Sequence, residues 1–348
     1  MFTNDQTYQI NAGGLQIGGG APVTIQTMWK KPLSGNENII GQLEDLKKIG
    51  CDIIRFAVPD TESAELLGII SASSPMPVVA DIHFDYKLAL RCMDFDIAKI
   101  RINPGNIGAE WKIKEVIEKA KDTGIPLRAG INGGSLPVNL RKMTNKAEAI
   151  ILAAEKEIEL FEKYSFTNAV FSLKSSDVET TITANELFAE KYRYPLHLGV
   201  TEAGPLIEGV VKNTAGVLPL LKKSIGATIR VSLSSNPSDE IIAGKALLYQ
   251  AGLRNKYVNI ISCPKCGRAT FDVHSFLSLV YDKINHISKP VSIAVMGCAV
   301  NGPQEAREAD LGITGSGNSV VIFKKGEIIK KISSAEAEDE FLKEIGNL

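Results

Sequence analysis

The stretch NKAEAIILAAEKEIELFEKYSFTNAVFSLK, residues 145–174, joins a helical pattern to a strand pattern. Apolar side chains recur every three or four positions through its first twenty residues, which predicts an amphipathic helix. NAVFSLK (168–174) then forms a short, mostly apolar run, as expected for a strand that is buried in a sheet. The stretch therefore predicts one helix–strand unit of an α/β fold.

The same unit recurs from residue 22 to about residue 250. Short runs rich in Val, Ile and Leu predict eight buried strands, at residues 22–28, 52–58, 77–82, 98–103, 126–132, 168–174, 195–201 and 228–233. Amphipathic stretches such as NIIGQLEDLKKIG (38–50) fill the gaps. Eight strand–helix units predict a TIM (β/α)8 barrel. A doubly wound open sheet is the alternative, but no GxGxxG follows the first strand.

The pattern changes after ALLYQAGLRNKY (246–257). A strand at VNIIS, a helix over residues 271–285 and a strand at VSIAVMG are followed by ADLGITG, SVVIFKKGEIIKK and a terminal helix. We therefore predict a barrel domain over residues 1–253, which binds the substrate, and a small α+β domain over residues 254–348, which holds a metal site.

Charge and composition narrow the function classes. The 348 residues include 39 basic and 40 acidic ones, and the net charge of −1 argues against nucleic acid or an anionic membrane surface as partner. No apolar run approaches the ~18 residues of a membrane helix, and MFTNDQTYQINAGGLQIGGG lacks the features of a secretory signal. We expect a cytoplasmic protein. Its five cysteines are then better explained as metal ligands or core residues than as disulfides.

Cations lie at or near the ends of several predicted barrel strands: Arg55, Arg101, Arg128, Lys174 and Arg230. A single one of them would more often form a structural ion pair inside the barrel. Together they outnumber the acids on the same strands, which are Asp52, Asp81 and Glu202. Guanidinium groups match phosphate oxygens, and barrel enzymes commonly bind phosphate at the carboxyl ends of their strands. The sequence thus predicts a multiply charged anion at the barrel mouth.

Acid–base residues also follow the predicted strands. Asp81 and His83 alternate in DIHFD and therefore share one side of the strand. Glu202 ends the seventh strand in GVTEAG, where a carboxylate beside phosphate-binding cations is suited to proton transfer. Each is also compatible with a polar residue that is bonded into a loop. His197, flanked by leucines, is predicted to be a core histidine with satisfied ring nitrogens.

The cysteines of the second domain indicate a metal site. Cys263 and Cys266 are three residues apart in CPKC, and Cys298 follows in VMGCAVNGPQEA. His274 would complete a zinc site, although it falls inside a predicted helix. Glu305 would instead supply a carboxylate as the fourth ligand of an iron–sulfur cluster. The other cysteines, Cys51 and Cys92, are predicted core residues.

Several motifs resemble those of the 4-hydroxy-3-methylbut-2-enyl diphosphate synthase family, in order and over essentially the full chain: VADIHFDY (79–86), NPGNIG (103–108), PLHLGVTEAG (195–204), TIRVSL (228–233), CPKCGR (263–268), FDV (271–273) and GCAVNGP (297–303). The chain is similar to the shorter bacterial form, which lacks the inserted domain of the plant type. The resemblance implies reductive ring opening and dehydroxylation of 2-C-methyl-D-erythritol 2,4-cyclodiphosphate in the non-mevalonate isoprenoid pathway.

The resemblance also implies roles for individual residues. The family holds a [4Fe-4S] cluster by three cysteines and a glutamate, which Cys263, Cys266, Cys298 and Glu305 match. The diphosphate-binding positions are matched by Arg55, Arg101, Arg128, Asn132, Lys174, Arg230 and Ser232. Polar groups near the reacting carbons are matched by Asp81, His83 and Glu202, and Asn301 matches the asparagine on the cluster side. Gln304 departs from the glycine that many members carry before the glutamate.

Partners follow from the same resemblance and from an absence. No nicotinamide or flavin fingerprint occurs in the chain, so we expect reduced ferredoxin or flavodoxin to deliver the electrons. The expected working unit is a head-to-tail homodimer, in which the barrel of one chain meets the cluster of the other. The alternatives are a sensor of phosphorylated metabolites with a structural zinc, and a radical enzyme, whose CxxxCxxC spacing is missing here.

Overall fold

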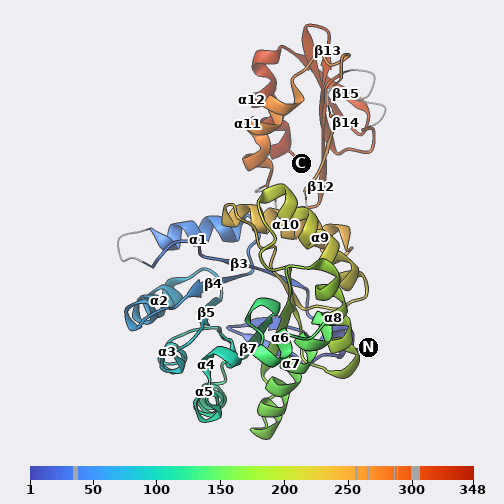
Figure 1. The fold of residues 1–348 in the computed structure, drawn as a ribbon. Coiled ribbons are helices and arrows are strands. Elements are labelled where there is room, and N and C mark those ends of the chain that lie inside the picture. Colours follow the sequence, from blue (N-terminus) through green and yellow to red (C-terminus); the bar gives the residue numbers. More distant parts are fainter. Residues whose placement is uncertain (34–37, 255–257, 265, 286, 288, 299–305) are drawn as a thin grey trace. The chain divides into compact units, whose positions relative to one another are not determined.

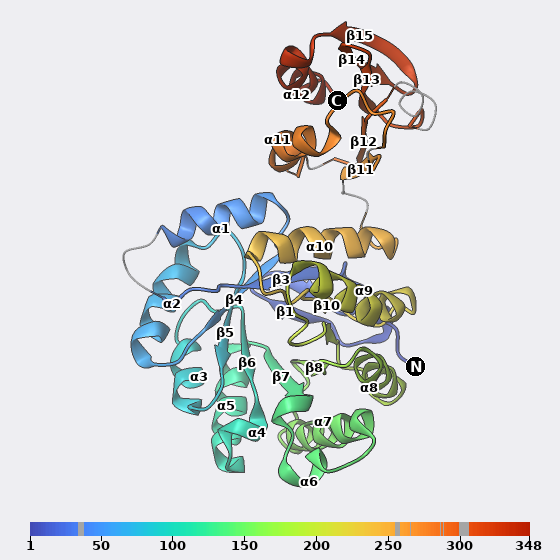
Figure 2. The ribbon, with the colours of Figure 1, turned by 45° about the horizontal axis from the view of Figure 1, so that its top comes forward.

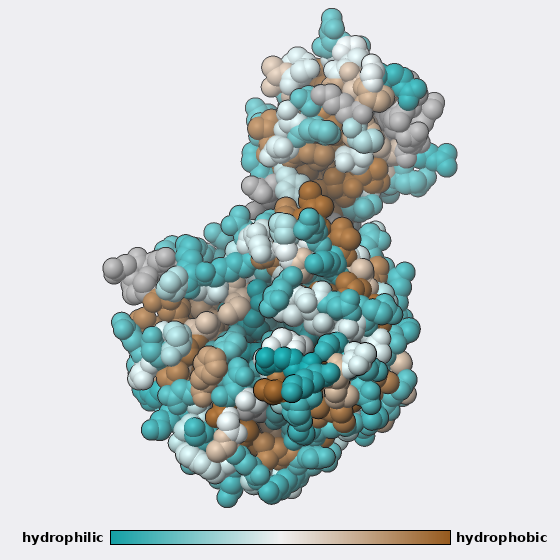
Figure 3. All heavy atoms as spheres, viewed as in Figure 1, coloured by the Kyte–Doolittle hydropathy of each residue, from teal (hydrophilic) through white to brown (hydrophobic). Residues whose placement is uncertain are grey.

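The structure is a computed structural model, and it describes residues 1–33, 38–254, 258–264, 266–285, 287, 289–298 and 306–348. The chain divides into two compact units, Met1–Arg254 and Asn255–Leu348 (Figure 1). Within the described ranges, no helix has both the length and the apolar character that a membrane crossing requires. Hydrophilic residues predominate on the visible surface of the first unit, with hydrophobic ones in small groups between them (Figure 3).

Eight parallel strands form the centre of the first unit, in the order β8-β7-β6-β5-β4-β3-β10-β9. A parallel bridge between Phe171 and Leu196 joins the two ends of the sheet, so the barrel is nearly closed. The predicted TIM barrel is confirmed, although its last two strands are shorter than predicted. The strands are β3 Thr24–Met28, β4 Ile53–Ala57, β5 Val78–Ile82, β6 Lys99–Ile102, β7 Leu127–Asn132, β8 Ala169–Lys174, β9 His197–Leu198 and β10 Thr228–Ile229.

Helices surround the barrel, as Figure 2 shows. Side chains of Asn or Asp cap several of them; Asn145, for example, accepts a hydrogen bond from the backbone N–H of Glu148. Residues 145–174, which were predicted to form one helix and one strand, contain α7 and β8. The helices are α1 Ile39–Lys48, α2 Thr61–Ser73, α3 Tyr86–Cys92, α4 Pro104–Ile107, α5 Glu110–Thr123, α6 Val138–Arg141, α7 Lys146–Lys163, α8 Val178–Lys191, α9 Leu206–Lys222 and α10 Pro237–Gln250, with 3-10 turns at Asn4–Gln6 and Gly133–Ser135.

The two faces of each barrel strand differ in character, because successive side chains point to opposite sides. On β4, Ile54 and Phe56 are fully buried in the hydrophobic core that the helices share, whereas Arg55 lines a cavity inside the barrel. The core between sheet and helices is therefore apolar. The interior of the barrel is polar, and this is where the candidate site lies.

An N-terminal hairpin, which the sequence pattern did not predict, closes the other end of the barrel. Its strands β1 Ile10–Ala12 and β2 Leu15–Ile17 pair in antiparallel fashion. Gly13 and Gly14 both have positive φ, as a tight two-residue hairpin turn requires. The buried side chains of the hairpin form one apolar cluster with residues at the starts of barrel strands: Ile10, Ala12, Ile17, Ile53, Val79, Val170 and Ala227.

The second unit is a small α+β domain, as predicted. Its sheet has the order β11-β12-β13-β14-β15, in which the first three strands are parallel and the last two antiparallel to their neighbours. Residues 319–331, which the sequence pattern did not divide into separate strands, form most of the hairpin β14–β15. The elements are β11 Val258–Ser262, α11 Val273–Asn285, β12 Val291–Met296, β13 Leu311–Ser316, β14 Ser319–Lys324, β15 Glu327–Ile332, a 3-10 turn at Ser334–Glu336 and α12 Ala337–Gly346. Both helices lie on one face of the sheet (Figure 1).

Candidate active site

A cavity of about 230 Å³ lies inside the barrel, toward the carboxyl ends of its strands. The seven residues that match the diphosphate-binding positions all line it, together with Asp81 and His83. They come from six different strands or the segments directly after them, so only the closed barrel brings them together. The lining consists of Met28, Arg55, Asp81, His83, Arg101, Arg128, Asn132, Ser172, Lys174, Thr201, Arg230 and Ser232.

Asp81 is the carboxylate at the centre of this cavity. Its Oδ1 accepts a hydrogen bond from Arg101 Nη1 at 2.9 Å, and its Oδ2 lies 3.4 Å from Arg55 Nε and 3.5 Å from His83 Nε2. Burial alone would raise the pKa of Asp81, but Arg55, the His83 ring and Arg101 outweigh that effect and hold the pKa well below its usual range. Asp81 is therefore an ionised counter-charge to the arginines.

Glu240, which the sequence pattern did not predict, provides a second carboxylate. It lies on α10 outside the sheet, is 1% exposed, and accepts hydrogen bonds from Arg230 Nε and Nη2, both at 3.1 Å. The Thr27 hydroxyl and Lys30 Nζ also contact it, at 2.7 and 2.9 Å. Glu240 thus fixes Arg230 at the cavity wall. The nearest signal in the sequence, an acid in the first turn of a helix, is too common to have identified it.

Sulfur and amide groups hold the other cations. Met28 Sδ accepts a hydrogen bond from Arg55 Nη2 at 3.0 Å, and Gln26 Oε1 accepts one from Arg128 Nη1 at 3.3 Å. Neither residue was predicted to belong to the site. Gln26 and Met28 lie two positions apart on β3, so their polar and polarisable side chains point to the same face of the strand. The neutral Gln26 amide orients the Arg128 guanidinium but leaves its charge uncompensated, and Arg55 shares the single charge of Asp81 with Arg101.

Positive charge therefore exceeds negative charge in this cavity. Asp52, counted as an acid of the same strands, lies at the opposite end of the barrel, where both its oxygens are 2.7 Å from Arg254 Nη2. Burial and the neighbouring Arg128 and Arg55 lower the pKa of Lys174 well below its ordinary value. An anion with more than one charge would relieve this repulsion, so the cavity has the electrostatics of a phosphate site.

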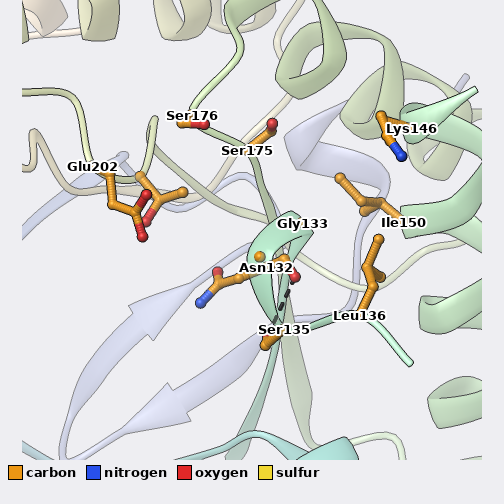
Figure 4. Close-up of a pocket in the computed structure, with 11 residues that line it drawn as sticks. Asn132, Gly133, Ser135, Leu136, Lys146, Ile150, Ser175, Ser176 and Glu202 are labelled. Atoms are coloured by element: carbon orange, nitrogen blue, oxygen red, sulfur yellow. Dashed lines mark hydrogen bonds between the residues drawn. The ribbon is translucent and has the colours of Figure 1, made fainter. Parts of the chain in front are cut away.

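Glu202 lines a second cavity of about 460 Å³, which shares Asn132 and Thr201 with the first. Figure 4 shows the Glu202 carboxylate and the Asn132 side chain on the same side of this cavity. Glu202 is exposed and has a φ of 51°, a conformation that non-glycine residues rarely adopt. Such strain is found most often at functional sites. Glu202 lies next to the cation cavity without lining it.

His197 and the two barrel cysteines are buried, as predicted. However, neither ring nitrogen of His197 has a hydrogen-bond partner among the described residues, so the prediction of a satisfied histidine is wrong. Burial and the positive charge of Lys174 lower the pKa of His197 well below its ordinary value. Burial raises the pKa of Cys51 and of Cys92 to about 12, which makes both thiols unreactive.

The predicted metal ligands follow two neighbouring strands of the second unit. Cys263 comes directly after β11 and Cys298 two residues after β12, and Ser262 pairs with Val295 in parallel register. The backbone N–H of Gly297 donates to Cys263 Sγ at 3.1 Å. Hydrogen bonds from the Arg268 backbone lower the pKa of the exposed Cys266. The lowered pKa of Cys266 favours its thiolate, the form that metal coordination requires.

The described residues do not complete a metal site. No three His, Cys, Asp or Glu side chains among them lie close enough together to hold a metal ion. The predicted fourth ligand Glu305, with Gln304 and Asn301, lies outside the described residues. His274, the alternative fourth ligand, is exposed at the start of α11.

Comparison with known families agrees with this architecture. The description "GcpE TIM-barrel domain" matches residues 7–245, and "GcpE protein C-terminal domain" matches residues 259–347. The chain belongs to the GcpE family. Its similarity extends to relatives that are each named 4-hydroxy-3-methylbut-2-en-1-yl diphosphate synthase (flavodoxin). The resemblance found in the sequence motifs is thus confirmed.

Two of these relatives span almost the whole chain. The protein from Treponema denticola is 50% identical over 350 residues, which cover 94% of this chain and 90% of the relative. The protein from Thermodesulfovibrio yellowstonii is 45% identical over 347 residues, which cover 99% of both chains. Both units of this GcpE-family chain therefore have counterparts in the relatives.

Replacing the central carboxylate tests the electrostatic description of the cavity. Asp81→Asn is expected to lower the free energy of unfolding by about 3–5 kcal/mol, because Arg55 and Arg101 lose a buried counter-charge. Sulfate should recover part of this loss by neutralising the same cations. Denaturant unfolding with and without sulfate measures both effects.

The matched control is Asp45→Asn, since Asp45 pairs with Lys48 at 3.0 Å on the exposed surface of α1. This change should cost less than about 1 kcal/mol. Equal losses in the two variants, or the same response to sulfate, would show that Asp81 is not the counter-charge of the cavity.

Proposed function

We propose that this chain converts 2-C-methyl-D-erythritol 2,4-cyclodiphosphate into 4-hydroxy-3-methylbut-2-enyl diphosphate, a step of isoprenoid precursor biosynthesis. The observation that carries the proposal is the excess of buried cations in one barrel cavity, in a chain whose relatives have this synthase name. A cyclic diphosphate is a compact dianion. It offers two phosphate groups to guanidinium and ammonium donors that lack carboxylate partners.

The chain's own residues bind and orient the diphosphate. Arg128 and Lys174 are buried donors for which the described structure gives no carboxylate partner, and Arg55 shares the single charge of Asp81 with Arg101. Phosphate oxygens would therefore complete the hydrogen bonding of all three. Arg101 and Arg230 are already held by Asp81 and Glu240, which fixes the shape of the cavity. Asn132 and Ser232 add neutral donors at its rim.

The reaction itself explains why cations should exceed carboxylates. Two electrons and one proton convert the cyclic dianion into the open trianion and one water. The bond between a ring carbon and a phosphate oxygen breaks, and that oxygen keeps the electron pair. The new negative charge therefore develops next to the arginines, where donors that are already in place stabilise it.

Two further proposals concern the cofactor and the protein that donates the electrons. We assign a [4Fe-4S] cluster to Cys263, Cys266, Cys298 and Glu305, because Cys263 and Cys298 follow two neighbouring strands, hydrogen bonds lower the pKa of Cys266, and no nicotinamide fingerprint occurs in the chain. When bound, such a cluster supplies electrons one at a time. Reduced flavodoxin is the proposed donor, from the relatives' names, with ferredoxin as the alternative. The cytoplasmic location stays a prediction.

Glu202 is the proposed proton donor to the departing hydroxyl group. Asp81 cannot take this part because its carboxylate is ionised and held by two arginines. His83, about half exposed beside Asp81, orients this ion pair at the edge of the cavity. Asn301 is assigned to contact substrate from the cluster side on the resemblance alone.

An anaerobic assay tests the proposal directly. After reconstitution with iron and sulfide, the protein should be brown, contain about four irons per chain, and reduce the cyclic diphosphate with photoreduced flavodoxin. Cys263→Ala should lose both the chromophore and turnover. A colourless protein with one zinc and no turnover would contradict the proposal and favour a metabolite sensor.

Replacement of the proton donor separates binding from chemistry. Glu202→Gln should leave the Michaelis constant nearly unchanged and lower the turnover number by about 10²–10⁴-fold, because the amide keeps size and hydrogen bonding but has no acidic proton. Glu208→Gln, an exposed glutamate in the first turn of α9, is the control and should behave as wild type. An unaltered turnover number for Glu202→Gln would exclude this role.

We also propose that the active unit is a homodimer in which each barrel works with the second unit of its partner. The support comes from the barrel unit alone. Its last residue, Arg254, pairs with Asp52 just before β4, at the end of the barrel away from the cation cavity. β11 begins at Val258, four residues later in the chain. Four residues extend at most about 14 Å, which is less than the roughly 17–20 Å length of a typical strand. This connection is therefore too short to span the barrel from that end to the cation cavity.

Mixed dimers test this arrangement. Cys298→Ala removes a cluster ligand, and Arg128→Ala removes a cation of the barrel cavity, so each variant alone should be inactive. After subunit exchange, each mixed dimer would contain one intact pair of barrel and cluster, and activity should return toward half of wild type. If mass spectrometry shows exchange and the mixture stays inactive, the site is built within one chain.

A further inference from the structure

Below the cation cavity, the barrel interior contains a layer of polar groups that the proposed function does not use. These atoms are buried and have no hydrogen-bond partner among the described residues: Thr24 Oγ1, Gln26 Nε2, Lys99 Nζ, both ring nitrogens of His197, and Thr228 Oγ1. The apolar cluster of the N-terminal hairpin closes the barrel on the far side. Unpaired buried polar atoms are rare in proteins, so this layer calls for an explanation.

Lys99 is the most costly member of the layer. It begins β6, is 0% exposed, and lies two residues before Arg101, on the same face of the strand. It does not line the 230 Å³ cavity, so it does not reach a ligand bound there. A buried lysine without an acceptor is unfavourable as an ammonium and much less so as a neutral amine.

The titratable groups around Lys99 in the barrel interior are almost all basic. They are Arg55 on β4, Asp81 on β5, Arg101 on β6, Arg128 on β7, Lys174 on β8, His197 on β9 and Arg230 after β10. Asp81 is already paired with Arg101 and Arg55. Burial, Arg128 and Arg55 together lower the pKa of Lys99 well below its ordinary value.

We propose that Lys99 is a proton-uptake group for the anion site: its amine is neutral in the empty barrel and becomes an ammonium when a phosphate anion fills the cavity above it. The bound anion cancels the charge of the arginines that otherwise exclude a further cation. Lys99 then adds one positive charge beneath the diphosphate without touching it. Lys99 is thus a positioning residue that acts through the field and through Arg128.

Such a group suits the reaction, and this part of the inference rests on the proposed function. Ring opening adds one negative charge to the diphosphate, and an ammonium below the arginines stabilises that charge as it forms. In the empty barrel the same lysine costs less than a buried ammonium would, because it stays neutral. Its stabilising charge is therefore present only when an anion is bound.

Calorimetry of anion binding tests the inference in the full-length protein. The probes are the cyclic diphosphate without reductant and cyclic trimetaphosphate, neither of which titrates near neutral pH. Binding heats in HEPES and in Tris at pH 8 give the number of protons taken up. Wild type should take up about one proton more per site than Lys99→Met, because methionine fills the same space without titrating.

Affinity should show the same linkage. If anion binding takes up one proton, the affinity falls by up to about tenfold for each unit that the pH rises between 7 and 9. This dependence of affinity on pH should be weaker in Lys99→Met. Removing a neutral, unpartnered amine leaves no buried group unpaired, so the variant should melt at or above the wild-type temperature. A melting curve therefore distinguishes loss of proton uptake from loss of fold.

Lys245→Met is the matched control, since Lys245 is a buried lysine on α10, outside the barrel interior. It should take up as many protons as wild type. If folded Lys99→Met also takes up as many protons as wild type, the inference is wrong. Turnover of the cyclic diphosphate without any Lys99-dependent proton uptake would support the proposed function and contradict this inference. Lys99-dependent proton uptake with trimetaphosphate in a protein that lacks turnover would support this inference and contradict the proposed function.

Discussion

The ion pair of Asp81 with Arg101 and Arg55 is the interaction on which the rest of the barrel interior depends. Asp81 faces Arg101 across β5 and β6, and Arg101 in turn faces Arg128 across β6 and β7. Without a carboxylate between them, these cations would be buried beside one another at a cost of several kcal/mol. One carboxylate is enough to hold them in place, and it is too little to neutralise them.

Apolar packing on the other face of the same strands offsets this electrostatic cost. Their outward residues belong to a hydrophobic core that extends through the helices, whereas the N-terminal hairpin seals the interior with a second apolar cluster. Burial lowers the local dielectric, which strengthens the interactions between these charges. The features that make the empty cavity unfavourable therefore make it a strong site for a diphosphate.

The sequence predicted what depends on short-range pattern and missed what depends on pairing through space. Eight apolar runs predicted the barrel strands, and cations within those runs predicted the residues of the cavity. Glu240 contacts Thr27, 213 positions earlier in the chain, and no local pattern reveals such a pair. Lys99 lies in the predicted strand 98–103, and no local pattern shows that its side chain is buried without a partner among the described residues. The hairpin strands have three residues each, too few to show a period.

A crystal structure of the protein with the cyclic diphosphate, in the absence of reductant, tests the central claim most directly. We expect phosphate oxygens within hydrogen-bond distance, about 2.7–3.2 Å, of Arg55, Arg128 and Lys174, with Asp81 still paired to Arg101. A diphosphate bound instead among Lys146, Ser175 and Ser176 of the larger cavity, with the arginines unliganded, would contradict it.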